Sequence, residues 1–228
     1  MKISVFGTGI VGQTIAGKLA DLGHDVAIGT RDPKATLTRT DKDSMGFPPF
    51  RDWHATHDKV RLLPFAEAAK HGELYFNALS GIGAIEGLRA AGEDALVGKV
   101  LVDVTNPLDF SKGFPPSLLV GNTDSLGEQI QRALPRTKVV KTLNTVNAFL
   151  MVDPKSLAGG EHTMFLAGND ADAKATVGNL LREGFGWTDL IDLGDLTNAR
   201  ATEAYVTLWA RLYGSLGIPQ FNVRVIRG

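Results

Sequence analysis

Residues 2–31 read KISVFGTGIVGQTIAGKLADLGHDVAIGTR, and this stretch decides the expected fold. A short β-branched run over 2–6 leads into a glycine turn, an amphipathic stretch over 11–22 and a second β-branched run over 25–29. A G-x-G-x-x-G turn between a strand and a helix is typical of a dinucleotide-binding βαβ unit. Its first glycine permits the tight turn, its second lets the backbone approach a pyrophosphate, and its third lets the helix pack on the strand. We therefore expect a pyrophosphate site at Gly7, Thr8, Gly9, Ile10, Val11 and Gly12.

The residues after the second run favour NADP over NAD. In NAD sites a carboxylate at this place binds the ribose hydroxyls, whereas an arginine nearby suits the 2′-phosphate of NADP. Here the run ends in Gly29 and Thr30, and two cations follow, Arg31 and Lys34. The Thr30 hydroxyl can donate a hydrogen bond, and both cations can pair with a phosphate. Asp32 leaves two interpretations open, because its carboxylate could face the ribose or neutralise Arg31.

The rest of the chain alternates short β-branched runs with longer amphipathic ones, which indicates a parallel sheet with helices on both faces. Further strands are expected over 59–63, 74–79, 99–104, 138–143, 163–168 and 188–194, and helices near 64–71, 84–95, 125–134 and 171–183. Asp170 is a candidate N-cap, and Ser125 with Glu128 forms a capping-box pattern. The sequence thus predicts a doubly wound, mostly parallel α/β sheet of the Rossmann type over 1–195. A helix from about Leu196 to Leu216 and a tail form a short appendage over 196–228.

Residues 36–58 fit no regular element. The stretch TLTRTDKDSMGFPPFRDWHATHD mixes charges, prolines and aromatics, and loops of this length are usually functional or mobile. Phe47, Phe50 and Trp53 could either cover a ligand or pin the loop to the body. His54 and His57 have the spacing of two metal ligands, but no third ligand is evident nearby, so we expect no metal site.

Polar loops follow the later strands, at the edge of the sheet where doubly wound folds bind their ligands. The first contains Ala78, Leu79 and Ser80, and the second contains Asn106 and Pro107; the third runs over 144–148. Their amides and hydroxyls could bind a ribose or a carboxamide. The same residue types also serve as ordinary caps and turns, so both interpretations stay open here.

Composition favours a small-molecule partner. The 228 residues are 43% hydrophobic with a net charge of −1, and no apolar run reaches the roughly 20 residues that a spanning helix needs. Such a balance offers no basic field for nucleic acid or anionic lipid. The absence of cysteine excludes disulfides and thiol chemistry and is compatible with a reducing compartment. We expect a cytoplasmic protein.

Three stretches resemble the NADPH-dependent deazaflavin (factor 420) reductases and the related reductase domain of six-transmembrane metalloreductases. They are FGTGIVGQTIAGKLADLGHDVAIGTR, KTLNTVNA and DLGDLTNARATEAYVTLWARLYGSLG. The resemblance implies direct hydride transfer between NADP(H) and a flavin- or deazaflavin-like ring, which requires positioning more than acid or base. It assigns Thr8 to Val11 to the pyrophosphate, Thr30, Arg31 and Lys34 to the 2′-phosphate, and Ala148 to the nicotinamide. Asn144 stands where those reductases carry His and Asn147 where they carry Pro, which makes both candidates for the acceptor site.

Alternative functions differ in testable ways. No Tyr is followed by Lys four residues later, which excludes a short-chain dehydrogenase. Carbonyl or imine reduction and a non-catalytic NADPH sensor remain as alternatives.

The last helix is apolar around much of its circumference, including Tyr205, Trp209 and Leu212, and the tail alternates apolar and polar residues. An apolar surface of that extent indicates a homodimer built on the helix and the tail.

Overall fold

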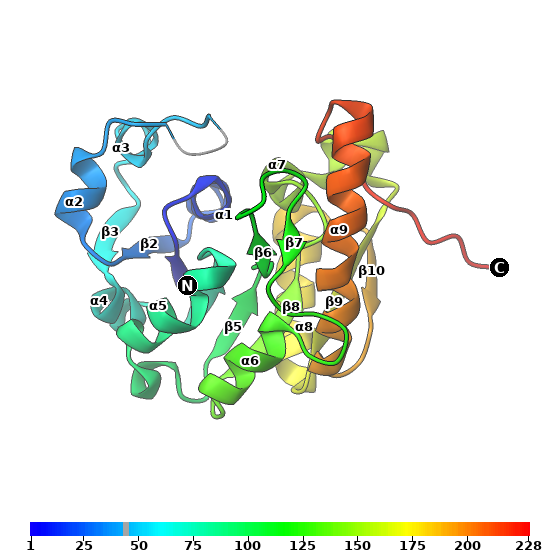
Figure 1. Cartoon of the computed structure of the whole chain (residues 1–228). Helices are drawn as coiled ribbons and strands as arrows, with labels where there is room; N and C mark the ends of the chain where they lie inside the picture. Colours follow the sequence, from blue (N-terminus) through cyan, green and yellow to red (C-terminus); the bar gives the residue numbers. More distant parts are fainter. Residues whose placement is uncertain (43–45) are drawn as a thin grey trace.

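The computed structural model describes residues 1–42 and 46–228, and Figure 1 draws the chain. The first half follows the expected alternation of strands and helices. Its elements are β1 (Lys2–Phe6), α1 (Ile10–Asp21), β2 (Asp25–Thr30), α2 (Pro33–Thr38), α3 (Phe50–His54), β3 (Arg61–Pro64), α4 (Phe65–His71), β4 (Leu74–Asn77), α5 (Ala84–Ala91) and β5 (Val100–Asp103).

The second half adds a two-stranded excursion and the remaining strands. Its elements are β6 (Leu108–Asp109), β7 (Ser117–Leu118), α6 (Leu126–Ala133), β8 (Lys138–Thr142), α7 (Ala148–Val152), β9 (Thr163–Gly168), α8 (Ala171–Asn179), β10 (Asp189–Asp192) and α9 (Ala199–Leu216). A π-helical turn over Leu180–Phe185 extends α8, and a 3₁₀ turn over Leu196–Asn198 precedes α9.

In the described residues, eight strands form one sheet in the order β10-β9-β8-β5-β4-β1-β2-β3. Every neighbouring pair is parallel except β8 and β9, which are antiparallel. This confirms the predicted doubly wound, mostly parallel sheet. The carboxyl ends of β1, β4, β5 and β8 therefore meet at one edge, where the loops after them converge.

Two apolar layers cover the two faces of the sheet, which is why its strands are apolar on both sides. In β1, Ile3 and Val5 belong to one layer and Phe6 to the other. The first layer takes side chains from α1, α7 and α8, and the second takes them from α4, α5 and α6. Figure 1 shows α5, α6 and α9 in front of the sheet.

The prediction of an irregular 36–58 segment is wrong in part. Helix α2 begins at Pro33 and ends at Thr38, and α3 covers Phe50–His54; residues 43–45 lie outside the described part. Phe50 is buried in the core, and Trp53 is partly buried and packs against the same core cluster. These two aromatics thus pin the segment to the body, whereas Phe47 lies at a cavity described below.

Helix α9 packs its inner face on the body, and the tail runs past the start of β9. Val206 and Ala210 are buried on that face. The Thr163 N–H donates to the Val223 carbonyl over 2.9 Å, and Asn222 Nδ2 donates to the Thr163 carbonyl over 3.0 Å. The tail is extended without joining the sheet, and its end projects away from the body (Figure 1). No helix in the described part of the chain is long and apolar enough to span a membrane.

Candidate active site

The glycine turn between β1 and α1 has the predicted local geometry. Gly7 has a φ of 122°, and a Cβ there would lie 2.4 Å from the Ala78 carbonyl oxygen. A Cβ on Gly12 would lie 2.1 Å from the Gly7 carbonyl oxygen. Only glycine fits these two positions, because the first needs a positive φ and the second lets the helix lie against the strand end. The space beside Gly9 is open.

The start of α1 presents unpaired backbone N–H groups to this turn. Gly9 is the N-cap and offers no side-chain acceptor, and the first turn of the helix carries no acidic residue. Gln13 holds the turn in place, because its Nε2 donates to the Thr8 carbonyl over 2.9 Å. Free N–H groups and the partial positive charge of a helix N-terminus suit an anion such as a pyrophosphate.

The end of β2 differs from the sequence-based expectation at two residues. Thr30 is buried, and its hydroxyl lies 2.9 Å from that of Thr36, which itself donates to the Asp32 carbonyl. The Thr30 proton is therefore used within the protein. The Asp32 carboxylate accepts from the Ala35 N–H over 2.9 Å and caps α2. Capping α2 therefore explains the aspartate at this position without a contact to a ribose or to Arg31.

Arg31 and Lys34 lie on the surface beside this cap. Both are exposed, and neither makes an ion pair or side-chain hydrogen bond with the residues that the structure describes. A guanidinium and an ammonium beside the second strand suit a 2′-phosphate. The contact itself stays a prediction.

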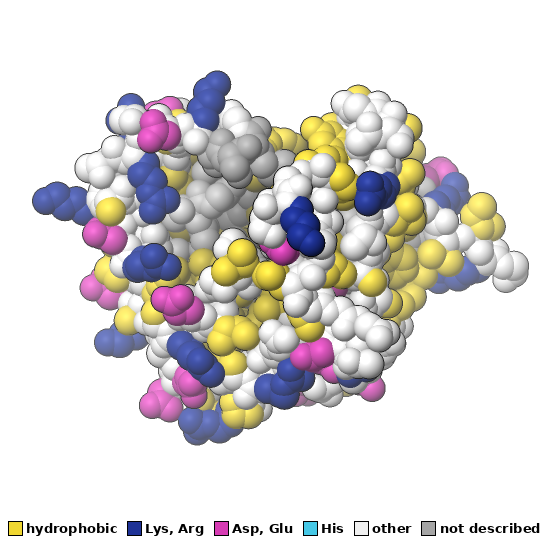
Figure 2. All heavy atoms as spheres, viewed as in Figure 1, with side chains coloured by type: hydrophobic (Ala, Val, Ile, Leu, Met, Phe, Trp, Pro, Cys, Tyr) yellow, Lys and Arg dark blue, Asp and Glu magenta, His cyan; other side chains and the backbone are white. Residues whose placement is uncertain are grey.

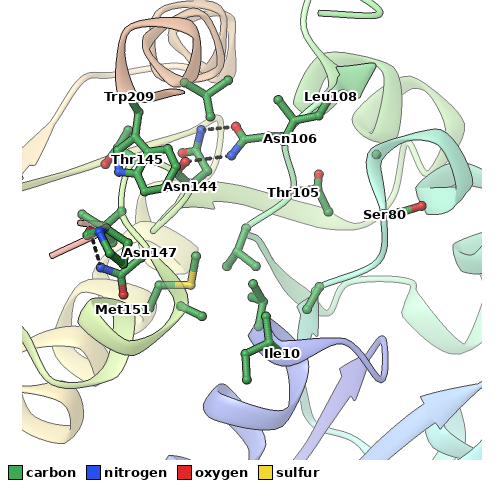
Figure 3. Close-up of a pocket in the computed structure, with 18 of the residues that line it drawn as sticks. Ile10, Ser80, Thr105, Asn106, Leu108, Asn144, Thr145, Asn147, Met151 and Trp209 are labelled. Atoms are coloured by element: carbon green, nitrogen blue, oxygen red, sulfur yellow. Dashed lines mark hydrogen bonds between the residues drawn. The ribbon is translucent and has the colours of Figure 1, made fainter. Parts of the chain in front are cut away.

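A cavity of about 460 Å³ opens between the start of α1, the loops after β4, β5 and β8, and helix α9 (Figure 3). Its described lining includes most of the predicted loop residues. These are Ile10, Val11, Ala78, Leu79, Ser80, Asn106, Asn144, Asn147 and Ala148. Pro107 is not among them; its carbonyl accepts from the Leu119 N–H over 2.8 Å. The glycine turn adjoins this cavity, whereas Thr30 ends the neighbouring strand β2 and Arg31 and Lys34 follow it.

The two candidate acceptor-site asparagines are held by internal hydrogen bonds. Asn144 Nδ2 donates to Asn106 Oδ1 over 3.0 Å, and Asn106 Nδ2 donates to the Asn144 carbonyl over 2.8 Å; Figure 3 shows the pair at the cavity. Asn147 caps α7 through the N–H groups of Phe149 and Leu150, and its amide donates to the Pro219 carbonyl over 2.7 Å. The Asn147 amide is fully used by these bonds, whereas Asn144 Oδ1 and one N–H each of Asn106 and Asn144 have no partner among the described residues and can bind a ligand.

Sequence reasoning missed the aromatic wall that α9 contributes. Val206, Trp209 and Tyr213 line the cavity, at intervals of three and four residues. The Trp209 ring stacks on Tyr213 and on Phe221, with centroids 5.5 and 5.3 Å apart. The helical spacing is visible in the sequence, where it predicts a dimer interface. The structure places Trp209 at the cavity.

The described lining is uncharged. It contains no Asp, Glu, His, Lys or Arg, and the phenol of Tyr213 is the one ionisable side chain among the described lining residues. Such a cavity can bind and orient a planar ring.

Comparison with known proteins agrees with this geometry. The family model for F420-dependent NADP oxidoreductases matches residues 2–107. A solved structure from Arthrobacter sp. FB24, provisionally described as an F420-dependent NADP reductase, is 56% identical with a TM-score of 0.95, and each chain covers 100% of the other. The chain belongs to this family. It is therefore an NADP-dependent oxidoreductase.

More distant relatives extend the comparison. The F420-dependent NADP reductase of Methanothermobacter marburgensis is 28% identical over 230 residues, which cover 99% of this chain and 98% of that protein. The metalloreductase STEAP3 of Rattus norvegicus is 27% identical over 204 residues, covering 89% of this chain. Only 36% of the rat protein is covered, so the chain spans about a third of that relative's length.

Proposed function

We propose that the protein transfers a hydride between NADP(H) and a flavin- or deazaflavin-like ring held in the cavity between α1 and α9. The observation that carries this proposal is the uncharged, largely apolar and aromatic lining of the described cavity. When bound, NADPH would supply the hydride, and reduction of the ring would consume one proton from solvent. Such a transfer depends on proximity and orientation, which this cavity can provide without a carboxylate, histidine or lysine.

Each part of the site has a separate task in this proposal. The glycine turn and the start of α1 hold the pyrophosphate, and Arg31 with Lys34 holds the 2′-phosphate. The rings of Trp209 and Tyr213 add aromatic surface to the cavity wall, against which the acceptor can pack. Ala148 begins α7 at the cavity, in agreement with a place near the nicotinamide. The Methanothermobacter relative, named for F420 and NADP, supports an acceptor of this class.

Steady-state oxidation of NADPH with riboflavin, FMN and a deazaflavin tests the proposal, and Tyr213→Phe sharpens it. We expect turnover with at least one of these acceptors. The variant should retain most of it, because the ring remains and only the phenol is lost. A loss of about 10²–10⁴-fold would identify the phenol as a general acid and favour carbonyl or imine reduction.

The sensor alternative predicts a different result. Tight NADPH binding in a titration, without oxidation by any flavin, deazaflavin, ketone, imine or ferric chelate, would contradict the proposal and support a non-catalytic module. Turnover of a ferric chelate without added flavin would instead favour the activity for which the rat relative is named.

A further inference from the structure

A fully buried ionic cluster lies beneath the cavity. The ammonium of Lys141, on β8, is 2.8 Å from Asp103 Oδ2 and 2.7 Å from Glu203 Oε1. It also donates to the Thr105 carbonyl over 2.6 Å. The side chains of Lys141 and Asp103 are completely buried, and that of Glu203 is 2% exposed. These charges come from β8, from the end of β5 and from α9, so the cluster joins three separate elements.

Every oxygen of the two carboxylates has a hydrogen-bond donor. Asn77 Nδ2 donates to Asp103 Oδ1 over 2.9 Å. The Leu126 and Gly127 N–H groups, at the start of α6, donate to Glu203 over 2.8 and 3.0 Å. Because these hydrogen bonds satisfy the carboxylate oxygens, the cluster can be buried. Buried ion pairs are nevertheless often no more stabilising than apolar residues of the same volume. Stability alone therefore does not explain why charges stand here.

The Lys141 ammonium remains charged under ordinary conditions. Burial by itself would lower the pKa of Lys141, but the carboxylates of Asp103 and Glu203 outweigh burial and hold that pKa above its usual value. The ammonium thus keeps all three of its donors, which are directed to two carboxylates and one carbonyl.

The loops that follow β5 and β8, and helix α9 itself, form part of the cavity wall. Thr105 lines the cavity, and the next residue, Asn106, pairs with Asn144. On α9, Trp209 lies six residues beyond Glu203, which is roughly 9 Å along the helix axis. The bonds of the ammonium to Thr105 and Glu203 therefore link the asparagine wall to the aromatic wall.

We propose that Lys141 is a positioning residue for the hydride acceptor, because its ammonium sets the separation between the Asn106–Asn144 wall and the Trp209 wall. This inference rests on the proposed function. The residue touches neither cofactor nor acceptor; it acts through the Thr105 carbonyl and the Glu203 carboxylate. Without it the walls lose their common anchor, and the acceptor ring is held less closely to its productive position.

Lys141→Met tests this directly, since methionine keeps most of the apolar stem and removes the charge. The acceptor kcat/KM should fall by about 10- to 100-fold, as expected when reacting groups move by about an ångström. The Kd of NADPH should stay near the wild-type value, because the glycine turn and Arg31 make no contact with the cluster. Kinetics are measured well below the variant's melting temperature.

Lys174→Met is the matched control. The Lys174 ammonium also binds one carboxylate, Asp192 Oδ1 at 2.9 Å, and one carbonyl, Gly194 at 3.0 Å, but it lies on α8 away from the cavity. It should lower stability while leaving the acceptor kcat/KM unchanged. If both variants lower stability and neither changes acceptor kinetics, the role of Lys141 is merely structural and the inference is wrong.

A second variant and a second readout keep the test decisive. If Lys141→Met does not fold, Glu203→Gln removes one charge of the cluster and should raise the acceptor KM with little change in NADPH affinity; unchanged KM would overturn the inference. Hydrogen exchange of residues 104–110 should accelerate in either cluster variant and not in Lys174→Met. If residues 104–110 exchange at the same rate in the cluster variants and in Lys174→Met, the positioning role of Lys141 is wrong even if the enzyme is active. A wild-type protein without activity would instead contradict the proposed function.

Discussion

At the scale of single residues, Arg31 is expected to decide which cofactor the protein prefers. It is exposed after β2, and the described residues hold it in no ion pair. Arg31→Ala should weaken NADPH binding by about ten- to a hundredfold, since a charge-assisted hydrogen bond contributes about 1.5–3 kcal/mol. NADH binding should be nearly unchanged, because NADH lacks the 2′-phosphate. Fluorescence titration of both cofactors measures the difference.

Arg39→Ala provides the control for this variant. Arg39 is an exposed cation at the opposite end of α2, so its loss changes the net charge equally without touching the start of that helix. If Arg39→Ala weakens NADPH binding as much as Arg31→Ala does, the effect is one of general charge. Equal wild-type affinities for NADPH and NADH would show that this loop has been assigned incorrectly.

Individual polar residues were the least predictable part of the site. Thr30, Asp32 and Asn147 were all considered as ligand contacts because they follow strands. In the structure Thr30 pairs with Thr36, Asp32 caps α2, and Asn147 caps α7 while donating to Pro219. A side chain of the same type can cap a helix or bind a ligand. Which role it takes depends on the partner that the fold brings to it. For Asn147 that partner is Pro219, which lies 72 residues away in the chain.

At the scale of elements, the sequence predicts well wherever the signal is local. The glycine turn, all eight strands of the main sheet and the N-caps Ser125 and Asp170 are confirmed. Helices α2, α3 and α7 were missed, because five or six residues are too few to show a helical period. The β6–β7 pair has two residues in each strand and shows no alternation either.

The start of α6 gives a stability prediction at this scale. Ser125 Oγ accepts from the Glu128 N–H over 3.1 Å and donates to the Glu128 carboxylate over 2.7 Å. Ser125→Ala should lower the free energy of unfolding by about 1 kcal/mol, because one N–H at the helix start loses its acceptor. Urea denaturation measures the change. Ser117→Ala, an exposed serine in β7, should stay within about 0.5 kcal/mol of wild type. Equal effects of the two substitutions would mean that the cap contributes nothing.

At the scale of the whole molecule, the cavity depends on contacts that no local pattern reveals. Helix α9 brings Trp209 to loops that follow β4, β5 and β8, so the site joins residues from about 10 to 219 along the chain. The sequence predicts the cofactor half because one βαβ unit contains the residues proposed for it. The aromatic half requires knowing where the last helix packs, and the contacts that hold it there, such as Glu203 with Lys141, join residues far apart in the chain.

The outer side of α9 and the tail carry the surface that we propose for a homodimer. Leu208, Leu216 and Ile218 are 52–55% exposed and Ile226 is 86% exposed. Figure 2 shows hydrophobic side chains gathered along one flank of α9 and on the projecting tail. Apolar surface of this extent favours association, and a two-fold contact would cover the same residues on both copies. Trp209 is unsuitable as a probe of this surface, because it lines the cavity.

Leu208→Glu is the sharper test of that dimer. A carboxylate placed on both copies at one two-fold contact would be desolvated next to its own image, which disfavours association. Sedimentation of the wild type at micromolar concentration should give about twice the 24.4 kDa of one chain, and the variant should give a mass near one chain. Leu22→Glu, at a 39% exposed leucine after α1, should remain dimeric. A wild type that sediments as a single chain with and without NADPH would rule the dimer out, and a dimer that survives Leu208→Glu would place its interface on another face.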